Sequence, residues 1–422
     1  MKLLYNIFIA LYPVAARLIS GKNAKAKLWT NGRRNIFEQL DASFQENKQP
    51  IVWMHCSSLG EFEQGRPVIE NLKRQTPNYK FLLTFFSPSG YEVRKNYAGA
   101  DWIFYLPMDS KKNAQQFFDI VKPSLILFVK YEFWYYYLNE AKQRNIPLIL
   151  VSGIFRSQQI FFKWYGNFYK EMLHCFTQLF VQNEECLQLL NSIGIQKNVV
   201  VSGDTRFDRV IEIAEQFEPI QAIEAFVGNN QVIVAGSTWT EDDEELDHYA
   251  NTHPKIKFII APHEIEDERI MECLSLYKNA VLFTDWELQI KDNPKQPSTP
   301  NVLIINNVGM LSQLYHYATI CYVGGAFGDD GVHNVLEAAV YNKPVVFGPV
   351  FEKYNEAIEL VDADGAISIG NALQLEKELD NLFNNTILCN QICANAGNYV
   401  KRRSGATNKI IQYIQEKRLL TN

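Results

Sequence analysis

Two acidic side chains lie in segments where a carboxylate could take a proton from a substrate hydroxyl. Glu61 ends the segment 55–61, in which small residues lead from an apolar run into a predicted helix. The start of a helix favours negative charge, so Glu61 is either a ligand-facing general base or a residue that only complements the helix dipole. Glu132 lies among aromatic residues, where an unpaired carboxylate would be costly, and Lys130 is a candidate partner for a structural salt bridge.

Two further loops combine small and hydroxyl-bearing residues. One follows the apolar run 81–85 and the other follows the run 232–235. Each precedes a predicted helix, where backbone N–H and hydroxyl groups could hold an anionic ligand, although turns of this composition are common. The candidate contact residues in these loops are Ser87, Ser89, Gly90, Gly236, Ser237 and Thr238.

The densest group of candidate ligand-binding residues is 322–339, where an apolar run leads into four glycines and a predicted helix. The spacing differs from the G-x-G-x-x-G pattern of nicotinamide-binding loops. We expect Gly331 to Asn334, with His333 between them, to place backbone N–H groups on a phosphate at the start of the helix. Glu337 would then reach a ribose from the same helix face as Asn334.

Parallel strands are needed to bring such loops to one edge of a sheet. Short apolar runs alternate with longer amphipathic ones, which predicts two successive parallel sheets wrapped by helices, with a ligand cleft between them. The segment 204–230 between the two sets is predicted to carry a helix and no strand. The predicted strands are 51–55, 81–85, 102–106, 125–129, 148–152, 179–182 and 199–202, followed by 232–235, 257–261, 280–283, 302–305, 320–323 and 345–347.

Length and charge narrow the class of protein. The 422 residues suit two domains of about 200 residues each. The formal net charge of −6 argues against a general nucleic-acid-binding protein, which would need a basic surface. Seven cysteines with irregular spacing indicate neither a disulfide framework nor a zinc site, so we expect buried thiols and a reducing cytoplasm.

The N-terminal segment 1–36 differs from the rest of the chain because it is basic and partly apolar. Its apolar stretch 3–19 is short for a membrane-spanning helix and is interrupted by polar residues. An apolar helix beside basic residues fits an anionic membrane surface, while a spanning helix, a signal peptide or an ordinary core helix are the alternatives. Seven basic residues and no acidic one occur before Glu38, namely Lys2, Arg17, Lys22, Lys25, Lys27, Arg33 and Arg34. We therefore expect a membrane-associated segment at 1–36, a first domain at 37–205 and a second at 206–422, whose last helix could pack back on the first.

Taken together, these segments resemble one known family. The loop and helix of 324–337 resemble the sugar-nucleotide signature of two-domain GT-B glycosyltransferases, and further segments, in the family's order, narrow the resemblance to the Kdo transferases. Those segments are 55–61, 87–90, 131–134, 182–185, 202–203, 207–208, 237–238, 310 with 314–315, and 333–339. The resemblance implies a GT-B fold of two Rossmann-like domains.

The resemblance also implies an activity. A Kdo transferase moves the acidic eight-carbon sugar Kdo from CMP-Kdo to a lipid A precursor, with inversion, at the cytoplasmic face of the inner membrane, and it requires no metal ion or other cofactor. Glu61 matches the family's general base, and the acceptor-binding positions are Ser58, Gly60, Ser87, Ser89, Gly90 and Glu132. The donor-binding positions are Gly236, Ser237, Thr238, Pro262, His263, Met310, Gly331, His333, Asn334 and Glu337.

The chain departs from the family pattern at the donor phosphate. Relatives commonly carry Pro-Arg-His after the second strand of the nucleotide domain, where this chain has Pro262-His263-Glu264. A protonated His263 or Arg269 on the following helix could supply the missing cation. Tyr135 also replaces a proline that often follows the aromatic motif. Two alternative functions remain open, namely another GT-B enzyme that uses a UDP- or GDP-sugar and a sugar-nucleotide-binding protein without catalysis.

Overall fold

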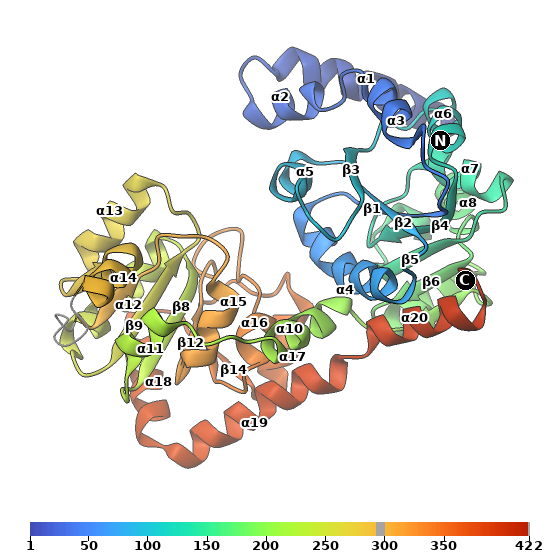
Figure 1. Ribbon diagram of the computed structural model, residues 1–422. Coiled ribbons are helices and arrows are strands. Elements are labelled where there is room, and N and C mark those ends of the chain that lie inside the picture. Colours follow the sequence, from blue (N-terminus) through green and yellow to red (C-terminus); the bar gives the residue numbers. More distant parts are fainter. Residues whose placement is uncertain (293–299, 421–422) are drawn as a thin grey trace. The chain divides into compact units, whose positions relative to one another are not determined.

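The computed structural model describes residues 1–292 and 300–420, and the chain divides into two compact units. The first unit comprises Met1–Arg209 and the chain from Ser404 onward, and the second comprises Val210–Arg403. Each unit is built on one seven-stranded sheet in which all strand pairs are parallel, with helices packed around it (Figure 1). The predicted fold class of two doubly wound α/β domains is confirmed.

The sheet of the first unit has the strand order β3-β2-β1-β4-β5-β6-β7. Its strands are β1 (Ile51–Cys56), β2 (Lys80–Phe85), β3 (Trp102–Tyr105), β4 (Pro123–Val129), β5 (Leu148–Gly153), β6 (Gln178–Val181) and β7 (Val199–Val201). Its helices are α1 (Lys2–Ile19), α2 (Ala24–Asn31), α3 (Ile36–Phe44), α4 (Leu59–Gln75), α5 (Pro88–Arg94), α6 (Lys111–Val121), α7 (Tyr135–Gln143), η1 (Ile160–Phe162), α8 (Asn167–Leu173), α9 (Glu184–Ser192) and α20 (Ala406–Glu416). Helix α10 (Thr205–Glu215) carries the chain across the boundary between the units.

The sheet of the second unit has the order β10-β11-β9-β8-β12-β13-β14. Its strands are β8 (Val232–Thr238), β9 (Lys257–Pro262), β10 (Ala280–Leu282), β11 (Val302–Ile304), β12 (Ile320–Val323), β13 (Val345–Phe347) and β14 (Ala366–Ser368). Its helices are α11 (Gln221–Val227), α12 (Thr240–Thr252), α13 (Asp267–Leu276), α14 (Phe283–Asp292), α15 (Leu311–Leu314), η2 (Tyr315–Tyr317), α16 (Leu336–Ala339), α17 (Asn355–Asp362), α18 (Ala372–Asn384) and α19 (Thr386–Arg403).

Side-chain alternation along the strands builds a core on each face of the first sheet. Ile51 and Trp53 of β1 join one hydrophobic cluster, whereas Val52 and Met54 join the other, as the two-residue period of a strand requires. Because both faces are covered, the strand is buried along its whole length. This explains why the run reads as continuously apolar rather than alternating.

The strand order reverses at one point in each sheet, and the candidate site loops follow the strands there. In the first unit β1 lies between β2 and β4, and in the second β8 lies between β9 and β12. Ligands of doubly wound sheets bind outside the carboxyl ends of strands at such reversal points. The loops after β1 and β4, and those after β8 and β12, therefore occupy the expected edges.

Helix α1 is long and apolar enough to cross a membrane, and only three of its 18 residues are buried. Tyr5, Ile9 and Ala16 are its buried residues. Leu4, Leu11 and Leu18 are exposed, and their spacing of seven residues places them on one face of the helix. The helix thus presents an apolar surface that the first unit does not cover.

Three details differ from the predictions. Strand β14 was not predicted, and the segment 204–230 carries two helices, α10 and α11, rather than one. The helix of the glycine-rich loop is the single turn α16, so residues 331–334 precede it rather than forming its start. Residues 331–333 follow an irregular path because their backbone N–H groups bond to carbonyls within the loop and to that of Val350.

Candidate functional site

The first candidate carboxylate, Glu61, lies in the first turn of α4, directly after the carboxyl end of β1. Helix α4 approaches the sheet closely at Gly65, where an added Cβ would lie 2.7 Å from the sulfur of Met54 and 2.9 Å from Cγ2 of Val129. Gly65 is one turn beyond Glu61 and on the same face of the helix. The glycine therefore allows α4 to bring Glu61 to the ends of β1 and β4.

The environment of Glu61 favours its protonated form. The side chain is buried, and its Oε2 accepts a hydrogen bond from the backbone N–H of Ser57. Burial, followed by the negative charge of Glu132, raises the pKa of Glu61 to about 8 from its ordinary value of 4.5. The Ser57 hydrogen bond and Lys130 oppose this shift. A carboxylate with a pKa near neutrality is well matched to general base catalysis.

The second carboxylate, Glu132, has partners that the sequence did not reveal. Its Oε2 lies 3.0 Å from Nε2 of His55 and also accepts a hydrogen bond from the indole N–H of Trp134. The loop after β4 places Glu132 at the end of the neighbouring strand β1, where His55 lies, and its pairing with Lys130 stays a prediction. Lys130 acts on the electrostatics of Glu61.

His55 connects Glu132 to a buried chain of hydrogen bonds. The indole of Trp53, which can only donate, bonds to Oγ1 of Thr84 at 2.8 Å. Nδ1 of His55 lies 2.9 Å from the Thr84 hydroxyl and 3.1 Å from the Thr84 carbonyl oxygen, while its Nε2 contacts Glu132. All three of these side chains are fully buried. The chain fixes the orientation of Glu132 and is a feature that sequence reasoning missed, because its members come from different strands.

The predicted acceptor loops after β1 and β2 lie side by side. The backbone N–H of Ser87 donates to the carbonyl of Ser57 at 2.8 Å, and the hydroxyls of Ser87 and Ser89 are 3.0 Å apart. Ser58 occupies the position just before α4, and Gly60 is exposed in the first turn of that helix. The structure thus groups these predicted positions around the start of α4.

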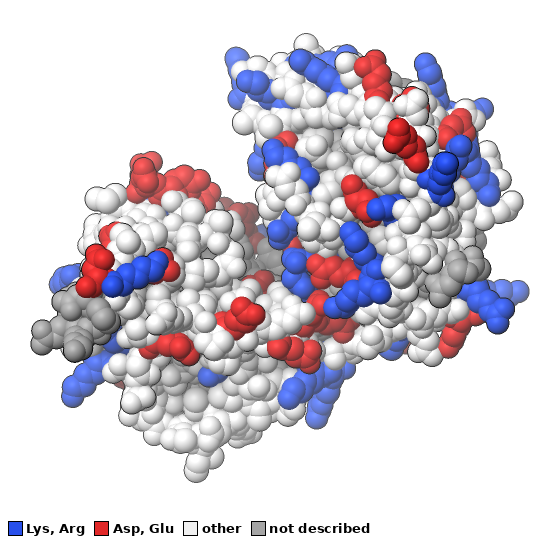
Figure 2. All heavy atoms as spheres, viewed as in Figure 1, with Lys and Arg blue, Asp and Glu red and all other residues white. Residues whose placement is uncertain are grey.

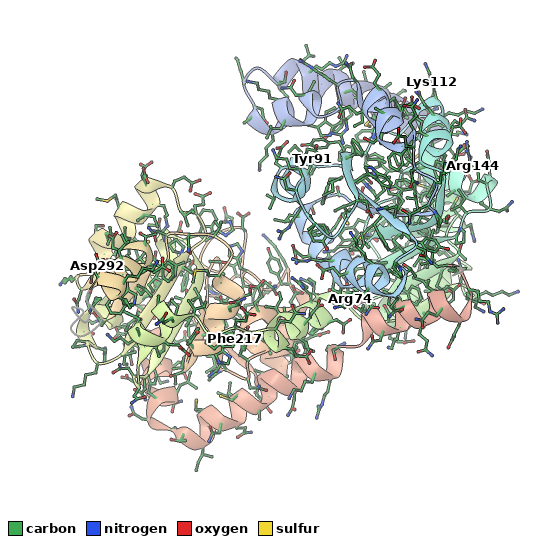
Figure 3. All side chains as sticks on the ribbon, viewed as in Figure 1. Arg74, Tyr91, Lys112, Arg144, Phe217 and Asp292 are labelled. Carbon is green, nitrogen blue, oxygen red and sulfur yellow. The ribbon has the colours of Figure 1, made fainter. Side chains whose placement is uncertain are left out.

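Helix α5, which carries the second of these loops, is held by aromatic contacts. Tyr91, which is labelled in Figure 3, stacks on Tyr105 of β3 with ring centroids 4.1 Å apart. Gly90 is buried against the ring of Phe85, which fills the space where a side chain would lie. Packing explains this glycine, so its predicted role in acceptor binding remains a prediction.

In the second unit, Asp242 joins the loops that follow β8 and β12. One carboxylate oxygen accepts from the backbone N–H groups of Trp239 and Gly325, at 2.9 and 2.8 Å, and the other accepts from the hydroxyl of Tyr322. Gly325 has a φ of +93°, which favours glycine. Buried Asp242 therefore caps the start of α12 and also holds the glycine-rich loop.

Three aromatic rings meet at this edge of the second sheet. His263 stacks on Trp239 at 4.7 Å and on His333 at 4.4 Å between ring centroids. The indole N–H of Trp239 also donates to Nε2 of His333 at 3.1 Å. Burial, with a contribution from His263, lowers the pKa of His333 to about 4, so His333 is neutral at neutral pH. Its Nδ1 then carries the proton and is a hydrogen-bond donor.

The predicted cradle of backbone N–H groups does not form as expected. The N–H groups of Gly331, Val332 and His333 donate to the carbonyls of Gly328, Val350 and Gly324, at 3.3, 3.0 and 3.1 Å. These donors are used inside the protein because the loop folds back on itself before the short helix α16. The phosphate contacts assigned to this stretch on the basis of a helix start are therefore corrected.

The structure also brings other predicted donor-site residues close to one another. The side-chain N–H of Asn334 donates to Glu337 at 2.8 Å, so these two residues are together. Gly236 lies against the side chains of Leu311 and Tyr315, on the segment that begins after Met310. Buried Thr238 adjoins this region, and its hydroxyl is without a hydrogen-bond partner among the described residues.

Arg269 does not replace the missing family arginine. Its guanidinium forms ion pairs with buried Asp243 and with Glu272, the latter at 2.9 Å. The pair with Asp243 joins helix α13 to α12, whereas the pair with Glu272 lies within α13. Buried Pro262 ends β9, and the exposed His263 follows it. Of His263 and Arg269, His263 is therefore the remaining candidate for the cation at the donor phosphate.

Residues 32–209 match the family described as 3-deoxy-D-manno-octulosonic-acid transferase (kdotransferase). The 3-deoxy-D-manno-octulosonic acid transferase of Aquifex aeolicus is 27% identical over 357 residues, which cover 82% of this chain and 91% of that protein. A bifunctional glycosyltransferase/methyltransferase of Fusobacterium nucleatum is 26% identical over 83% of this chain, but the match spans only 55% of that longer protein.

Among solved structures, UDP-GlcNAc 2-epimerase from Neisseria meningitidis is similar in fold, with a TM-score of 0.63 at 16% identity. The match covers 87% of this chain and all of the epimerase chain. The shared fold agrees with the two doubly wound units, and the sequence relatives agree with the resemblance noted in the motifs. The chain is therefore similar over most of its length to Kdo transferases, and these relatives indicate a glycosyltransferase with a GT-B fold.

Proposed function

We propose that this protein transfers Kdo from CMP-Kdo to a lipid A precursor, lipid IVA, in the synthesis of the lipopolysaccharide core. The observation that carries the proposal is the buried Glu61, whose pKa is raised to about 8 at the carboxyl end of β1. Similarity to the 3-deoxy-D-manno-octulosonic acid transferase of Aquifex aeolicus supports the choice of sugar. The chain spans only about half the length of the glycosyltransferase/methyltransferase of Fusobacterium nucleatum. Methyl transfer is therefore not part of the proposal.

Glu61 acts in this proposal as the general base. Its carboxylate takes the proton of an acceptor hydroxyl, and the oxygen forms a bond to the anomeric carbon of Kdo. The bond between that carbon and the phosphate oxygen breaks, and CMP leaves with the electron pair. Attack from the face opposite to the leaving group inverts the anomeric centre, as in the one-base logic of inverting glycosidases.

The donor is assigned to the second unit. The unpartnered hydroxyl of Thr238 and the Nδ1–H of neutral His333 are candidate donors to the CMP phosphate. Glu337 is the candidate partner of the ribose, with Gly236, Ser237, Pro262, His263, Met310, Gly331 and Asn334 as its surroundings. Hydrogen-bond donors can stabilise a leaving phosphate, so we expect transfer to persist after chelation of divalent metals with EDTA.

Helix α1 is assigned to the inner membrane. Its uncovered apolar face and the basic residues beside it support association with the anionic cytoplasmic surface. Figure 2 shows Lys and Arg side chains gathered over the part of the first unit where Figure 1 labels α1 and α2. Sedimentation of the full chain with vesicles, but not after deletion of residues 2–19, would test this assignment.

The test of the proposed reaction is incubation with CMP-Kdo and lipid IVA, followed by mass spectrometry of the lipid. We expect a mass increase of one or more Kdo residues and its loss in Glu61→Gln. Glu241→Gln is the matched control, because Glu241 is an exposed acid in the first turn of α12. Transfer from a UDP- or GDP-sugar instead, or full activity of Glu61→Gln, would overturn the proposal.

A further inference from the structure

A cavity of about 750 Å³ lies in the first unit, lined by helices α1, α2 and α3 and by the loop after β3. Three arginines line it, Arg17, Arg33 and Arg34, together with one carboxylate, the exposed Glu38. Within residues 1–292 and 300–420, none of the three guanidinium groups forms an ion pair. The cavity is therefore positively charged.

Arg33 is the least solvated of these cations. Its guanidinium donates to the backbone carbonyls of Leu106, Phe86 and Trp29, at 2.9, 2.8 and 3.3 Å. The rings of Trp29, Tyr105 and Phe86 lie 4.1, 4.8 and 5.0 Å from its central carbon. Burial lowers the pKa of Arg33 to about 9. The carbonyls accept hydrogen bonds from the guanidinium and the rings pack on it, but none of these groups carries a negative charge. A bound anion would neutralise the buried charge of Arg33.

Two further donors of the same cavity are unused. The indole nitrogen of Trp29 and the hydroxyl of Thr30 are buried and have no hydrogen-bond partner among the described residues. Both residues line the cavity, and Trp29 is only 6% exposed. Buried donors are normally satisfied, so an unpaired indole N–H beside three guanidinium groups points to an absent acceptor.

A second, apolar cavity of about 290 Å³ shares Trp29 with the first. Its lining includes Tyr12, Ala15 and Ile19 of α1, and the loop residues Phe86 and Ser87. An anionic group in the larger cavity and a hydrocarbon chain in the smaller one would together match an amphiphile. The uncovered apolar face of α1 also favours a lipid over a small soluble anion, because it would contact hydrocarbon chains.

We propose that the cavity lined by α1, α2 and α3 binds the phosphate group of a lipid, with Arg17 and Arg34 contacting the phosphate oxygens beside Arg33 and the Trp29 indole. Phosphate presents several acceptor oxygens in a geometry that guanidinium groups match. The proposal rests on the membrane association of α1 and is independent of which sugar is transferred. The phosphate belongs either to a bulk phospholipid or to the acceptor lipid, and the chemistry of recognition is the same.

The first test compares two double variants of the full chain, Arg17→Gln with Arg34→Gln, and Lys22→Gln with Lys27→Gln. Each removes two exposed positive charges from the region of α1 and α2, but only the arginines line the cavity. Binding is measured on phosphatidylcholine vesicles that contain either phosphatidic acid or an amount of oleate giving the same surface charge. We expect the arginine variant to bind phosphatidic acid vesicles about tenfold more weakly than the lysine variant, and the two variants to bind oleate vesicles equally.

The second test removes one donor without removing charge. Trp29→Phe keeps the ring that packs on Arg33 but lacks the indole N–H. We expect it to weaken binding to phosphatidic acid vesicles severalfold and to leave binding to oleate vesicles unchanged. Equal losses on both kinds of vesicle, for this variant or for the two double variants, would show a general charge or packing effect and would overturn the proposal.

Two further arms separate the sources of the phosphate. If the acceptor supplies it, the arginine variant raises KM for lipid IVA in neutral detergent without lowering kcat, whereas a phospholipid site leaves this KM unchanged. Inorganic phosphate at millimolar concentration should not displace the protein from phosphatidic acid vesicles. Displacement by inorganic phosphate would show a site for free phosphate and overturn the lipid assignment. Absence of vesicle binding by the unmodified chain would instead reject the membrane association itself, while Kdo transfer could still be measured in detergent.

Discussion

At the scale of single residues, Glu61 and Glu132 set the pH dependence of the proposed reaction. Burial is the largest cause of the raised pKa of Glu61 and the charge of Glu132 is the second. We expect kcat/KM to rise with pH, with an apparent pKa of about 8, because the deprotonated carboxylate is the base. Glu132→Gln removes the negative charge while an amide can still bond to His55 and Trp134. Its profile should shift to lower pH, and an unchanged profile would show that the two carboxylates do not interact.

The same pKa shift predicts a trade between activity and stability. Glu61 takes up a proton on folding, so the stability that it contributes falls as pH rises from its ordinary pKa of 4.5 to about 8. Glu61→Gln avoids this penalty, and we expect its free energy of unfolding to exceed that of the unmodified chain by roughly 2–4 kcal/mol at pH 8 and to match it near pH 4. Urea denaturation at both pH values measures this. Glu241→Gln should show no such pH-dependent gain.

At the scale of elements, the close approach of α4 to the sheet positions the base. Gly65→Ala would press a methyl group against Met54 and Val129, and we expect a loss of about 1–2 kcal/mol despite the better helix propensity of alanine. A shift of α4 also moves Glu61, so kcat should fall about tenfold or more. Thermal unfolding and initial rates measure both effects. Gly60→Ala, where nothing lies within 4 Å of the added carbon, is the control for stability and should not destabilise the chain.

Elements with a strong local pattern were predictable. Runs such as Val232–Ala235 are rich in β-branched residues and lie within observed strands. Strand β14 was missed because Ala366–Ser368 is short and carries a single β-branched residue, so its place at the sheet edge is decided by pairing with β13. The helix after the glycine-rich loop was overestimated, because Asn334 accepts from the N–H of Leu336 and starts the helix only there.

The site was less predictable than the elements, because its decisive contacts join distant parts of the chain. Glu61 and Glu132 could be singled out from their neighbours in sequence. The bond from His55 to Glu132 spans 77 residues, and that from Trp239 to His333 spans 94. Local reasoning offered Arg269 as a phosphate partner instead, but Arg269 pairs with Asp243. Strand order, rather than proximity in sequence, decides which side chains meet.

At the scale of the whole molecule, the chain completes its first unit with its last helix. Helix α20 (red in Figure 1) places Ile410, Ile411 and Ile414 in the hydrophobic cluster on one face of the first sheet. The chain leaves this unit within α10 and returns at Ser404. The unit therefore cannot be cut from the chain as one continuous segment without exposing part of its core.

The start of α20 is held by a residue from the departing helix. Gly405 precedes α20 with a φ of +102° and has no side chain to cap the free N–H groups of the first turn. Asp208 of α10 supplies this function, since its two carboxylate oxygens accept from the N–H groups of Gly405 and Thr407. A negative charge at this position also complements the helix dipole.

Asp208→Ala should consequently loosen α20 more than a typical surface change would. We expect a loss of about 1–2 kcal/mol in unfolding free energy, in the range for removal of a helix cap, and faster amide hydrogen exchange in the first turns of α20. Asp267→Ala is the matched comparison, because Asp267 is an exposed acid in the first turn of α13 and caps no other helix, and its effect should stay within about 0.5 kcal/mol. If amide exchange in α20 were unchanged in Asp208→Ala, burial of the three isoleucines of α20 alone would hold the helix. The hydrogen bonds from Asp208 of α10 to the start of α20 would then not be needed for its stability.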